Sequence, residues 1–316
     1  MNQPVAVGAA TLRAIVYNPT SGARPSARLV ARVAELFRAE GDVVALPTER
    51  HGHAADLVEE LLRGRPRELT DVLALGGDGT LNEVLFGAWR AGAFLPGGPP
   101  LRAGVLPAGS TNVVARSLGI PRDPLRAAAR LIAGGAARLD LGLCRGESGT
   151  RPFLLACGVG YDAEVAQGVS PRLKRLLGRH AYFMQALGAT GDRHRGLTVE
   201  WERADSTRDV REAASVIIGN CPLYAGVVRL RRDASLQDAL LDLALLPSTG
   251  FMPLLSAAIT GILSDLASSR GVVVEPARSV RVRSGRPVAV HVDAEPMGTT
   301  PIEVEVLPGA LDFRTP

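Results

Sequence analysis

The segment that most constrains the fold is LALGGDGTLNEVL, residues 73–85, in which a glycine-rich turn joins an apolar run to a helix-like stretch. The apolar run is typical of a buried β-strand, and the stretch after it is typical of the first turns of a helix. Gly76, Gly77 and Gly79 permit a sharp turn and let a ligand approach the main chain closely. Because a helix start presents unpaired N–H groups and the positive end of its dipole, the turn predicts an anion site, most simply for phosphate.

One carboxylate, Asp78, lies among these glycines. Because it would repel a bare phosphate, we expect a divalent cation, or a phosphate that carries Mg²⁺, beside it. On its own, this short pattern fits an ordinary strand-to-helix turn equally well. The function of the turn therefore depends on what else lies close to it.

Strand-like and helix-like segments alternate around this turn. Strands are expected at 12–17, 43–46, 71–75 and 103–107, and helices at 26–41, 53–64, 80–89 and 111–119. In the first helix, the apolar residues follow the spacing of one helix face, with Leu29, Val33, Leu36 and Phe37. The alternation predicts an α/β fold with a parallel sheet that helices cover on both faces, and with ligands beyond the carboxyl ends of the strands.

The pattern changes after about Gly135. Short apolar runs, many of alternating polarity, are separated by Gly, Pro, Asp or Ser, at 138–144, 152–158, 197–203, 213–220, 240–246, 272–276, 279–284, 287–293 and 301–307. Two helical stretches, about 161–190 and 251–268, interrupt these runs. Such a pattern predicts a mostly antiparallel β-sandwich as a second domain.

Composition narrows the possible partners. The 36 Lys and Arg residues against 32 Asp and Glu give a net charge of +4, which suits anionic small molecules or an anionic membrane surface but is too weak to indicate nucleic acid. Cys144, Cys157 and Cys221 fit neither a disulfide framework nor a zinc site, so we expect them in the core of a protein from the reducing cytoplasm. The start of the chain lacks the pattern of a signal peptide, and the apolar stretch 251–266 is too short to span a bilayer.

Two further turns repeat the chemistry of the first. The turn VYNPTSG, residues 16–22, offers the hydroxyl groups of Thr20 and Ser21 and the backbone of Gly22. The stretch LPAGSTNVVARSLGIP, residues 106–121, again runs from a strand into a helix. Because neighbouring strand ends converge at one edge of a parallel sheet, three such turns together favour a single anion site.

Acidic residues stand beside two of the later strands. Asp238 precedes the run at 240–246, and Asp293 and Glu295 end the run at 287–293. In an extended chain the side chains of the second pair face the same way, as a metal site or a general base requires. In isolation, a solvated turn carboxylate at Asp238 and acidic residues at a strand edge explain these positions better.

In their order along the chain, these stretches resemble the diacylglycerol kinase catalytic-domain family, which includes bacterial lipid kinases, sphingosine kinases and ceramide kinases. The resemblance spans nearly the whole chain and is carried by NPTSG (18–22), GGDGTLNEV (76–84), PAGSTNVVARSLGIP (107–121), CGVGYDAEV (157–165), GNCPLYAG (219–226), DALLDLALL (238–246) and VDAEPMG (292–298). It implies an α/β nucleotide-binding domain at 1–137, completed by 307–316, and a β-sandwich domain for the lipid substrate at 138–306.

The resemblance also implies ATP-dependent phosphorylation of a hydroxyl group of a lipid alcohol such as diacylglycerol. The positions that match the surroundings of ATP are Asn18, Pro19, Thr20, Ser21, Gly22, Thr48, Gly77, Asp78, Gly79, Thr80, Leu81, Asn82, Glu83 and Ser110. Asp78 matches the aspartate that organises the Mg²⁺ of the nucleotide, and Glu295 matches the general base for the lipid hydroxyl. A second Mg²⁺ site, of structural character, corresponds to Asp238 together with the backbone carbonyl groups of Leu240 and Ser235.

Three residues depart from the family's pattern. Val113 stands where many relatives have an aspartate, so a carboxylate network that joins Asp78 to Asp140 would be incomplete. Ala239 and Ala294 replace the usual glycines. If either position needs a positive φ, alanine costs about 1 kcal/mol and can shift the neighbouring ligand. The sequence therefore supports the second metal site less firmly than the ATP site.

Two other functions stay open. An NAD kinase also carries GGDGT, but the next glycine-rich strand end, PAGSTN, lacks the NxGxxGF pattern expected of that enzyme. A non-catalytic regulator that binds a lipid or a nucleotide would explain the three departures, although it has no chemical need for Asp78 and Glu295.

The implied partners are a lipid substrate and a transiently contacted membrane surface, for a cytoplasmic protein that can be peripheral at the inner face of the membrane. No nucleic acid is expected, and a homodimer is an open option. The stretch SPRLKRLLGRHAYF, residues 170–183, mixes basic and apolar residues in a way that suits a headgroup interface. A solvated helix packed on the sandwich fits this stretch at least as well.

Overall fold

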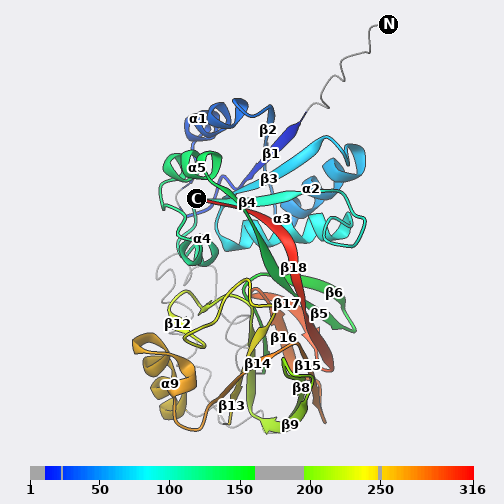
Figure 1. Cartoon of the computed structure of the whole chain (residues 1–316), viewed down its shortest axis with the longest axis vertical. Coiled ribbons are helices and arrows are strands. Elements are labelled where there is room, and N and C mark those ends of the chain that lie inside the picture. Colours follow the sequence, from blue (N-terminus) through cyan, green and yellow to red (C-terminus); the bar gives the residue numbers. More distant parts are fainter. Residues whose placement is uncertain (1–10, 23, 161–195, 248–250) are drawn as a thin grey trace, which may run out of the picture. The chain divides into compact units, whose positions relative to one another are not determined.

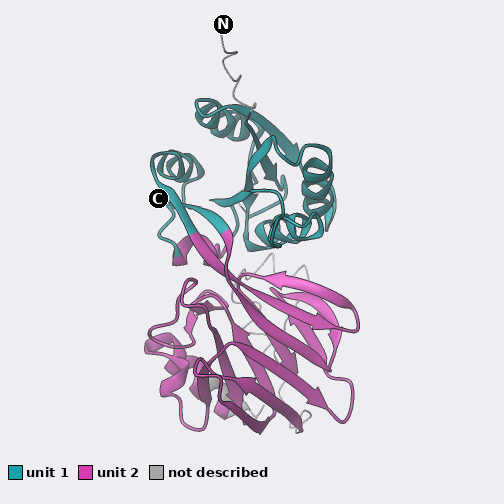
Figure 2. Ribbon diagram, turned by 45° about the vertical axis from the view of Figure 1, so that its right-hand side comes forward, with its two compact units in different colours: residues 1–109, 118–137, 312–316 teal, residues 110–117, 138–311 magenta. Residues whose placement is uncertain are grey.

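The computed structural model describes residues 11–22, 24–160, 196–247 and 251–316 (Figure 1). The chain divides into two compact units: unit 1 contains residues 1–109, 118–137 and 312–316, and unit 2 contains residues 110–117 and 138–311 (Figure 2). The stretch at 170–183 that was considered for membrane contact lies outside the described residues.

Unit 1 contains a parallel sheet with the strand order β2, β1, β3, β4. Strands and helices alternate along the chain as β1 (Leu12–Tyr17), α1 (Ala27–Arg38), β2 (Asp42–Pro47), α2 (His53–Gly64), β3 (Leu69–Gly76), α3 (Asp78–Arg90), β4 (Arg102–Pro107) and α5 (Pro124–Ala133). Helix α1 packs against α5 and α2 packs against α3, and Figure 1 shows the two pairs on opposite sides of the sheet. The predicted parallel sheet with helices on both faces is confirmed.

Two details of the helices differ from the sequence prediction. Helix α1 buries Val30 and Ala34 together with Val33 and Phe37, whereas Leu36, which was assigned to the buried face, is 38% exposed. Helix α5 was not predicted, although Asp123 caps it by accepting a hydrogen bond from Arg126 N at 2.8 Å. The difference at Leu36 arises on a helix face, where neighbouring elements decide which residues are covered.

The end of the chain joins the unit 1 sheet. Strand β18 (Ile302–Thr315) places Asp312 and Phe313 beside β4 in parallel. The next residue, Arg314, pairs through Nε with Oδ1 of the fully buried Asp71 at 2.6 Å. We name as the Asp71 cluster the set of Asp71 and the three guanidinium groups around it, those of Arg13, Arg102 and Arg314.

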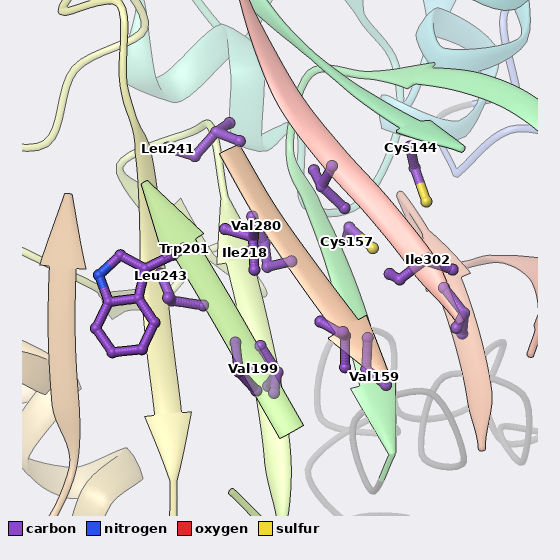
Figure 3. Close-up of a cluster of buried hydrophobic side chains, with 14 of the residues drawn as sticks. Cys144, Cys157, Val159, Val199, Trp201, Ile218, Leu241, Leu243, Val280 and Ile302 are labelled. Carbon is purple, nitrogen blue, oxygen red and sulfur yellow. The ribbon is translucent and has the colours of Figure 1, made fainter. Parts of the chain in front are cut away.

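Unit 2 is built from two antiparallel sheets. One contains β18 with β5 (Gly135–Gly146), β6 (Gly149–Phe153), β8 (Leu197–Glu202), β9 (Arg208–Ala213) and β15 (Ser279–Ser284). The other has the order β14 (Val273–Ala277), β13 (Leu241–Leu246), β10 (Ser215–Gly219), β7 (Ala156–Gly160), β16 (Ala289–Val292) and β17 (Glu295–Thr299). Alternate side chains of both sheets, such as Val199 of β8 and Val159 of β7, form one apolar core (Figure 3). The predicted β-sandwich is confirmed.

The remaining described elements of unit 2 are α4 (Val113–Ser117), β11 (Leu223–Tyr224), β12 (Val228–Arg229), α9 (Phe251–Leu263) and the 3₁₀ helix η1 (Leu266–Ser268). Helix α4 follows β4 in the chain but groups with unit 2, because Arg116 Nη1 donates to Gly226 O at 2.7 Å and Ser117 Oγ lies 3.2 Å from Cys221 Sγ. All three cysteines are buried, as expected for core residues.

Candidate active site

The turns that follow β1, β3 and β4 are joined by main-chain hydrogen bonds. Asn18 N donates to Leu75 O at 3.3 Å, which links the first turn to the glycine-rich turn. Ala108 N and Gly109 N both donate to Gly76 O, at 2.7 and 3.1 Å, which links the third turn to the same place. The strand ends are in register, so the three turns predicted from the sequence converge at the carboxyl edge of the unit 1 sheet.

The turn after β1 is preorganised by its own side chains. Asn18 Oδ1 accepts hydrogen bonds from Thr20 N at 2.8 Å and Thr20 Oγ1 at 2.9 Å, which forms an Asx turn. Thr48 N donates to Tyr17 O at 2.9 Å and brings the end of β2 beside this turn. Ser21 Oγ is shielded from solvent and has no hydrogen-bond partner in the described part of the chain. A shielded hydroxyl of this kind is unfavourable unless a ligand supplies the missing partner.

The glycine-rich turn places the start of α3 at the same edge. A Cβ atom on Gly76 would lie 2.4 Å from Thr80 Oγ1, so this position tolerates no side chain. The helix begins at Asp78, and the residue before it, Gly77, has no side chain with which to cap it. Gly79 is exposed, and nothing lies within 4 Å of the position that its Cβ would take. The first turn of α3 is therefore accessible to an anion.

The other positions matched to ATP have different surroundings. Leu81 and Asn82 are buried within unit 1. Glu83 Oε2 accepts a hydrogen bond from Ala54 N at 3.1 Å, and Glu83 Oε1 lies 3.1 Å from His51 Nδ1. Glu83 thus braces the start of α2, beside the turn after β2. Ser110 is exposed and belongs to the segment that groups with unit 2.

Glu295 does not end an extended strand, as the sequence interpretation assumed. Strand β16 ends at Val292, which pairs with Glu295, the first residue of β17. Asp293 and Ala294 form the turn between them, with φ values of 49° and 67°. Two such values are typical of a type I′ hairpin. Because the chain reverses here, the two acidic side chains are not a same-face pair on one strand.

Asp293 holds this hairpin in place. Its Oδ1 accepts hydrogen bonds from Leu155 N at 3.0 Å and Ala156 N at 2.9 Å, and its Oδ2 accepts one from Leu154 N at 3.1 Å. Its own N–H donates to Ala156 O at 2.8 Å. A carboxylate with three main-chain donors has a structural role, so the position of Glu295 in the hairpin is fixed by its neighbour.

The residues matched to a second Mg²⁺ site do not fit that ion. Asp238 Oδ2 is 3.1 Å from the guanidinium Nη2 of Arg231, and its Oδ1 accepts a hydrogen bond from Leu240 N at 3.1 Å. Since Mg²⁺ requires free oxygen ligands, an arginine at this position opposes it.

The two alanines that replace glycines do have positive φ. Ala239 has a φ of 60° and Ala294 a φ of 67°, so the strain anticipated from the sequence is present at both. Ala239 N donates to Asp140 Oδ2 at 2.7 Å, and Asp140 Oδ1 accepts a hydrogen bond from Gly309 N at 2.7 Å. Both oxygens of this buried carboxylate are therefore taken by the main chain. Val113, which lacks a carboxylate, is itself buried at the start of α4.

Sequence reasoning missed two residues at these sites. His51 precedes α2 and meets Glu83, and Arg231 meets Asp238. The available signal for Arg231 was the run RRDASLQD, in which two arginines stand close to two aspartates. Such runs usually lie in solvent, so the sequence could not show that one guanidinium would be enclosed.

Comparison with known proteins agrees with this geometry. Residues 13–144 match the model of the diacylglycerol kinase catalytic domain, and residues 156–314 match that of the YegS C-terminal NAD kinase beta sandwich-like domain. The diacylglycerol kinase of Bacillus subtilis (strain 168) is 30% identical over 292 residues, which cover 92% of this chain and 91% of that protein. The diacylglycerol kinase of Staphylococcus haemolyticus (strain JCSC1435) is 30% identical over 311 residues, which cover 96% of this chain and 87% of that protein.

Solved structures share the fold. A crystal structure of a diacylglycerol kinase from Bacillus anthracis str. Sterne superposes with a TM-score of 0.75 at 21% identity, over 99% of both chains. A second structure from the same organism gives a TM-score of 0.79 at 20% identity and covers 100% of this chain and 99% of its own.

Proposed function

Because the chain belongs to the diacylglycerol kinase family, we propose that it is a lipid kinase that transfers the γ-phosphoryl group of ATP to a hydroxyl group of a lipid alcohol such as diacylglycerol. The observation that carries the proposal is the meeting of three turns at the carboxyl edge of the unit 1 sheet. Phosphoryl transfer depends mainly on positioning and on charge neutralisation, which main-chain N–H groups and a bound cation can supply.

We assign nucleotide binding to the residues of these turns and their neighbours. They are Asn18, Pro19, Thr20, Ser21, Gly22, Thr48, Gly77, Asp78, Gly79, Thr80, Leu81, Asn82, Glu83 and Ser110. Ser21 Oγ has no hydrogen-bond partner among the described residues and can donate to an oxygen of the ligand. Leu81 and Glu83 act indirectly, through the packing of α3 and through the start of α2.

Asp78 is the proposed partner of the Mg²⁺ that accompanies the nucleotide. This role needs only one protein carboxylate, because Mg²⁺ in kinases is held largely by phosphate oxygens and water. When bound, the ion neutralises charge on the phosphates. Asp78 is partly exposed at the start of α3, where a carboxylate is compatible with the helix dipole.

Glu295 is the proposed general base for the lipid hydroxyl. It is the first residue of β17, and Asp293 anchors the hairpin turn before it through three main-chain donors. Glu295→Gln keeps size and hydrogen bonding but cannot accept a proton. We expect kcat to fall by about 10²- to 10⁴-fold with little change in ATP affinity. Glu303→Gln, on the exposed face of β18, is the matched control and should keep its activity.

The decisive experiment is a transfer assay with radiolabelled ATP and a panel of acceptors, followed by chromatography of the products. The panel contains diacylglycerol, phosphatidylglycerol, a sphingoid base and NAD. We expect label in a lipid and none in NAD. Asp78→Asn should abolish transfer without a change in melting temperature, whereas Asp42→Asn, at the opposite edge of the same sheet, should leave transfer intact. Label in NAD, or no transfer by the wild-type chain to any acceptor, would contradict the proposal.

The lipid substrate implies transient contact with a membrane, and we assign this contact to α9. Among the described residues, no helix combines the length and the apolar character needed to cross a bilayer. On α9, however, Ile259, Ile262 and Leu263 are exposed, the last of them by 81%. Exposed Arg229 belongs to β12, which packs against α9, and exposed Arg270 follows η1, which also packs against α9. Apolar side chains with basic neighbours suit an anionic lipid surface.

Sedimentation with vesicles tests this contact without catalysis. Ile262→Asp should weaken binding to vesicles that contain phosphatidylglycerol by about tenfold or more. The variant loses an aliphatic side chain that would be buried in the membrane, and it adds a negative charge that the anionic vesicle repels. Val210→Asp is the control, since Val210 is also exposed but lies on β9. Equal loss in both variants would exclude α9 as the docking face.

A further inference from the structure

The guanidinium group of Arg231 lies among three carboxylates in unit 2. Its Nε donates to Asp242 Oδ1 at 2.8 Å, its Nη1 lies 2.7 Å from Asp233 Oδ2, and its Nη2 lies 3.1 Å from Asp238 Oδ2. Each guanidinium nitrogen therefore meets a different carboxylate. We name these four residues, Arg231, Asp233, Asp238 and Asp242, the Arg231 cluster.

The cluster closes one loop of the chain. The loop leaves β12 and the fully buried Leu230 and returns to the main sheet at β13, which contains Asp242. Arg231 stands at the start of the loop and pairs with Asp233 near the start, with Asp238 in the middle and with Asp242 at the end. The Arg231 side chain is only 16% exposed, and that of Asp242 is 5% exposed, so both charges depend on each other for compensation.

The same geometry opposes a metal ion at Asp238, the carboxylate matched to the second Mg²⁺ site. An ion bound to Asp238 would approach within a few ångströms of a guanidinium group that already holds one of its oxygens. The other oxygen accepts the main-chain hydrogen bond from Leu240 N. Arginine offers a fixed planar set of donors and stays charged at every physiological pH, so it can bridge several carboxylates without a metal.

We propose that Arg231 replaces the structural cation of this site, so that the loop 231–242 is held by a positive charge that is built into the chain. The fold of unit 2 then needs no divalent ion, and any metal requirement of the enzyme comes from the nucleotide alone. This inference concerns the fold of unit 2 and does not rest on the proposed transfer reaction.

Thermal unfolding without nucleotide tests the replacement. The melting temperature of the wild-type chain should be the same in EDTA and in millimolar MgCl₂. Arg231→Ser should lower it by roughly 5–15 °C, because three carboxylates then lack their cation. In this variant MgCl₂ or CaCl₂ should restore part of the loss, since the vacated oxygens can coordinate the ion. Arg232→Ser is the control, because Arg232 is 80% exposed and has one long contact, 3.7 Å to Asp265.

If Arg231→Ser does not fold, two further measurements test whether Arg231 replaces the structural cation. Arg231→Lys keeps the charge but cannot bond three carboxylates in one plane, so it should show a smaller loss with the same response to cations. Electron paramagnetic resonance with Mn²⁺ should count the same number of bound ions in the wild-type chain and in Asp238→Asn. A melting temperature of the wild-type chain that falls in EDTA, or an ion that is lost in Asp238→Asn, would overturn the proposal.

Discussion

The Asp71 cluster of unit 1 and the Arg231 cluster of unit 2 have opposite charge. In the Asp71 cluster of unit 1, one fully buried carboxylate meets three guanidinium groups, at 2.6, 3.0 and 3.6 Å. In the Arg231 cluster of unit 2, one guanidinium group meets three carboxylates, at 2.7, 2.8 and 3.1 Å. The residue types and distances are alike, and only the stoichiometry differs.

The difference shows that the charges around a buried carboxylate decide whether the effect of burial on its pKa is outweighed. Burial by itself raises the pKa of Asp71, but Arg314 and Arg102 outweigh it, so the pKa lies below its ordinary value. Burial raises the pKa of Asp242 to about 6, because it outweighs the effect of Arg231, and Asp238 and Asp233 add like charge. Asp238 also has a raised pKa, chiefly from burial. A surplus of guanidinium groups keeps a buried carboxylate ionised, whereas a surplus of carboxylates favours a proton.

The largest effect is expected from removal of the guanidinium that ties the chain end to unit 1. Arg314→Ala leaves the buried Asp71 with weaker compensation and should cost about 3–5 kcal/mol of unfolding free energy. Arg102 also pairs with Asp71, but its own side chain is 40% exposed, so Arg102→Ala should cost about 1 kcal/mol or less of unfolding free energy. Denaturant unfolding of both variants measures the difference. Equal losses of unfolding free energy in the two variants would show that Arg314 stabilises Asp71 no more than Arg102 does.

The pH dependence of stability should have opposite signs in the two clusters. The folded pKa of Asp71 lies below 3.8, so its contribution to stability is complete above pH 3.8 and is lost as the pH falls through the folded value. The folded pKa of Asp242 is about 6 and its ordinary value 3.8, so its contribution is complete below pH 3.8 and is lost as the pH rises to about 6. A shift of this size corresponds to roughly 2–3 kcal/mol.

Asparagine variants separate these two contributions. Asp242→Asn should remove a fall in unfolding free energy between pH 3.8 and about 6, and Asp71→Asn should flatten the profile on the acid side of pH 3.8. Unfolding free energies measured across both windows check the signs. If Asp242→Asn leaves the profile between the two values unchanged, Asp242 is ionised in the folded chain and the contrast between the clusters is wrong.

The smallest effect concerns strain in the loop of the Arg231 cluster. Ala239 has a φ of 60°, which glycine adopts without cost. Ala239→Gly should therefore stabilise the chain by about 1 kcal/mol while it keeps the hydrogen bond from its N–H to Asp140 Oδ2. Ala204→Gly, in a turn with negative φ, should bring no gain and serves as the control. The melting temperatures of the two variants, each compared with that of the wild-type chain, measure this difference.

The architecture of both units could be predicted from the sequence because it rests on local patterns. The period of apolar residues identified the strands β1 to β4, and the glycines between β3 and α3 identified the turn. These signals involve residues a few positions apart. They failed where contacts with distant elements decide the outcome, as at Leu36, which has the spacing of a buried residue but is 38% exposed.

The hairpin at Asp293 and Ala294 shows a second kind of failure. The residues themselves contain no glycine and were interpreted as an extended segment, and only the family resemblance, in which a glycine usually stands at Ala294, pointed to a positive φ. The turn is stabilised by main-chain donors of Leu154, Leu155 and Ala156, which lie 137 to 139 positions away in the chain. These distant hydrogen bonds outweigh the local preference for an extended chain. Glu295 therefore begins the next strand and does not share one strand face with Asp293.

The sequence by itself determined the order of strands and helices, the three turns at the strand ends and the presence of the residues matched to ATP. The tertiary structure alone decided which charges meet: Arg314 pairs with Asp71 from 243 positions away, and Arg231 pairs with Asp238. The physical reason is that periodicity is a property of neighbours in the chain. The energy of an ion pair depends instead on distance and burial in space, which the folded chain alone supplies.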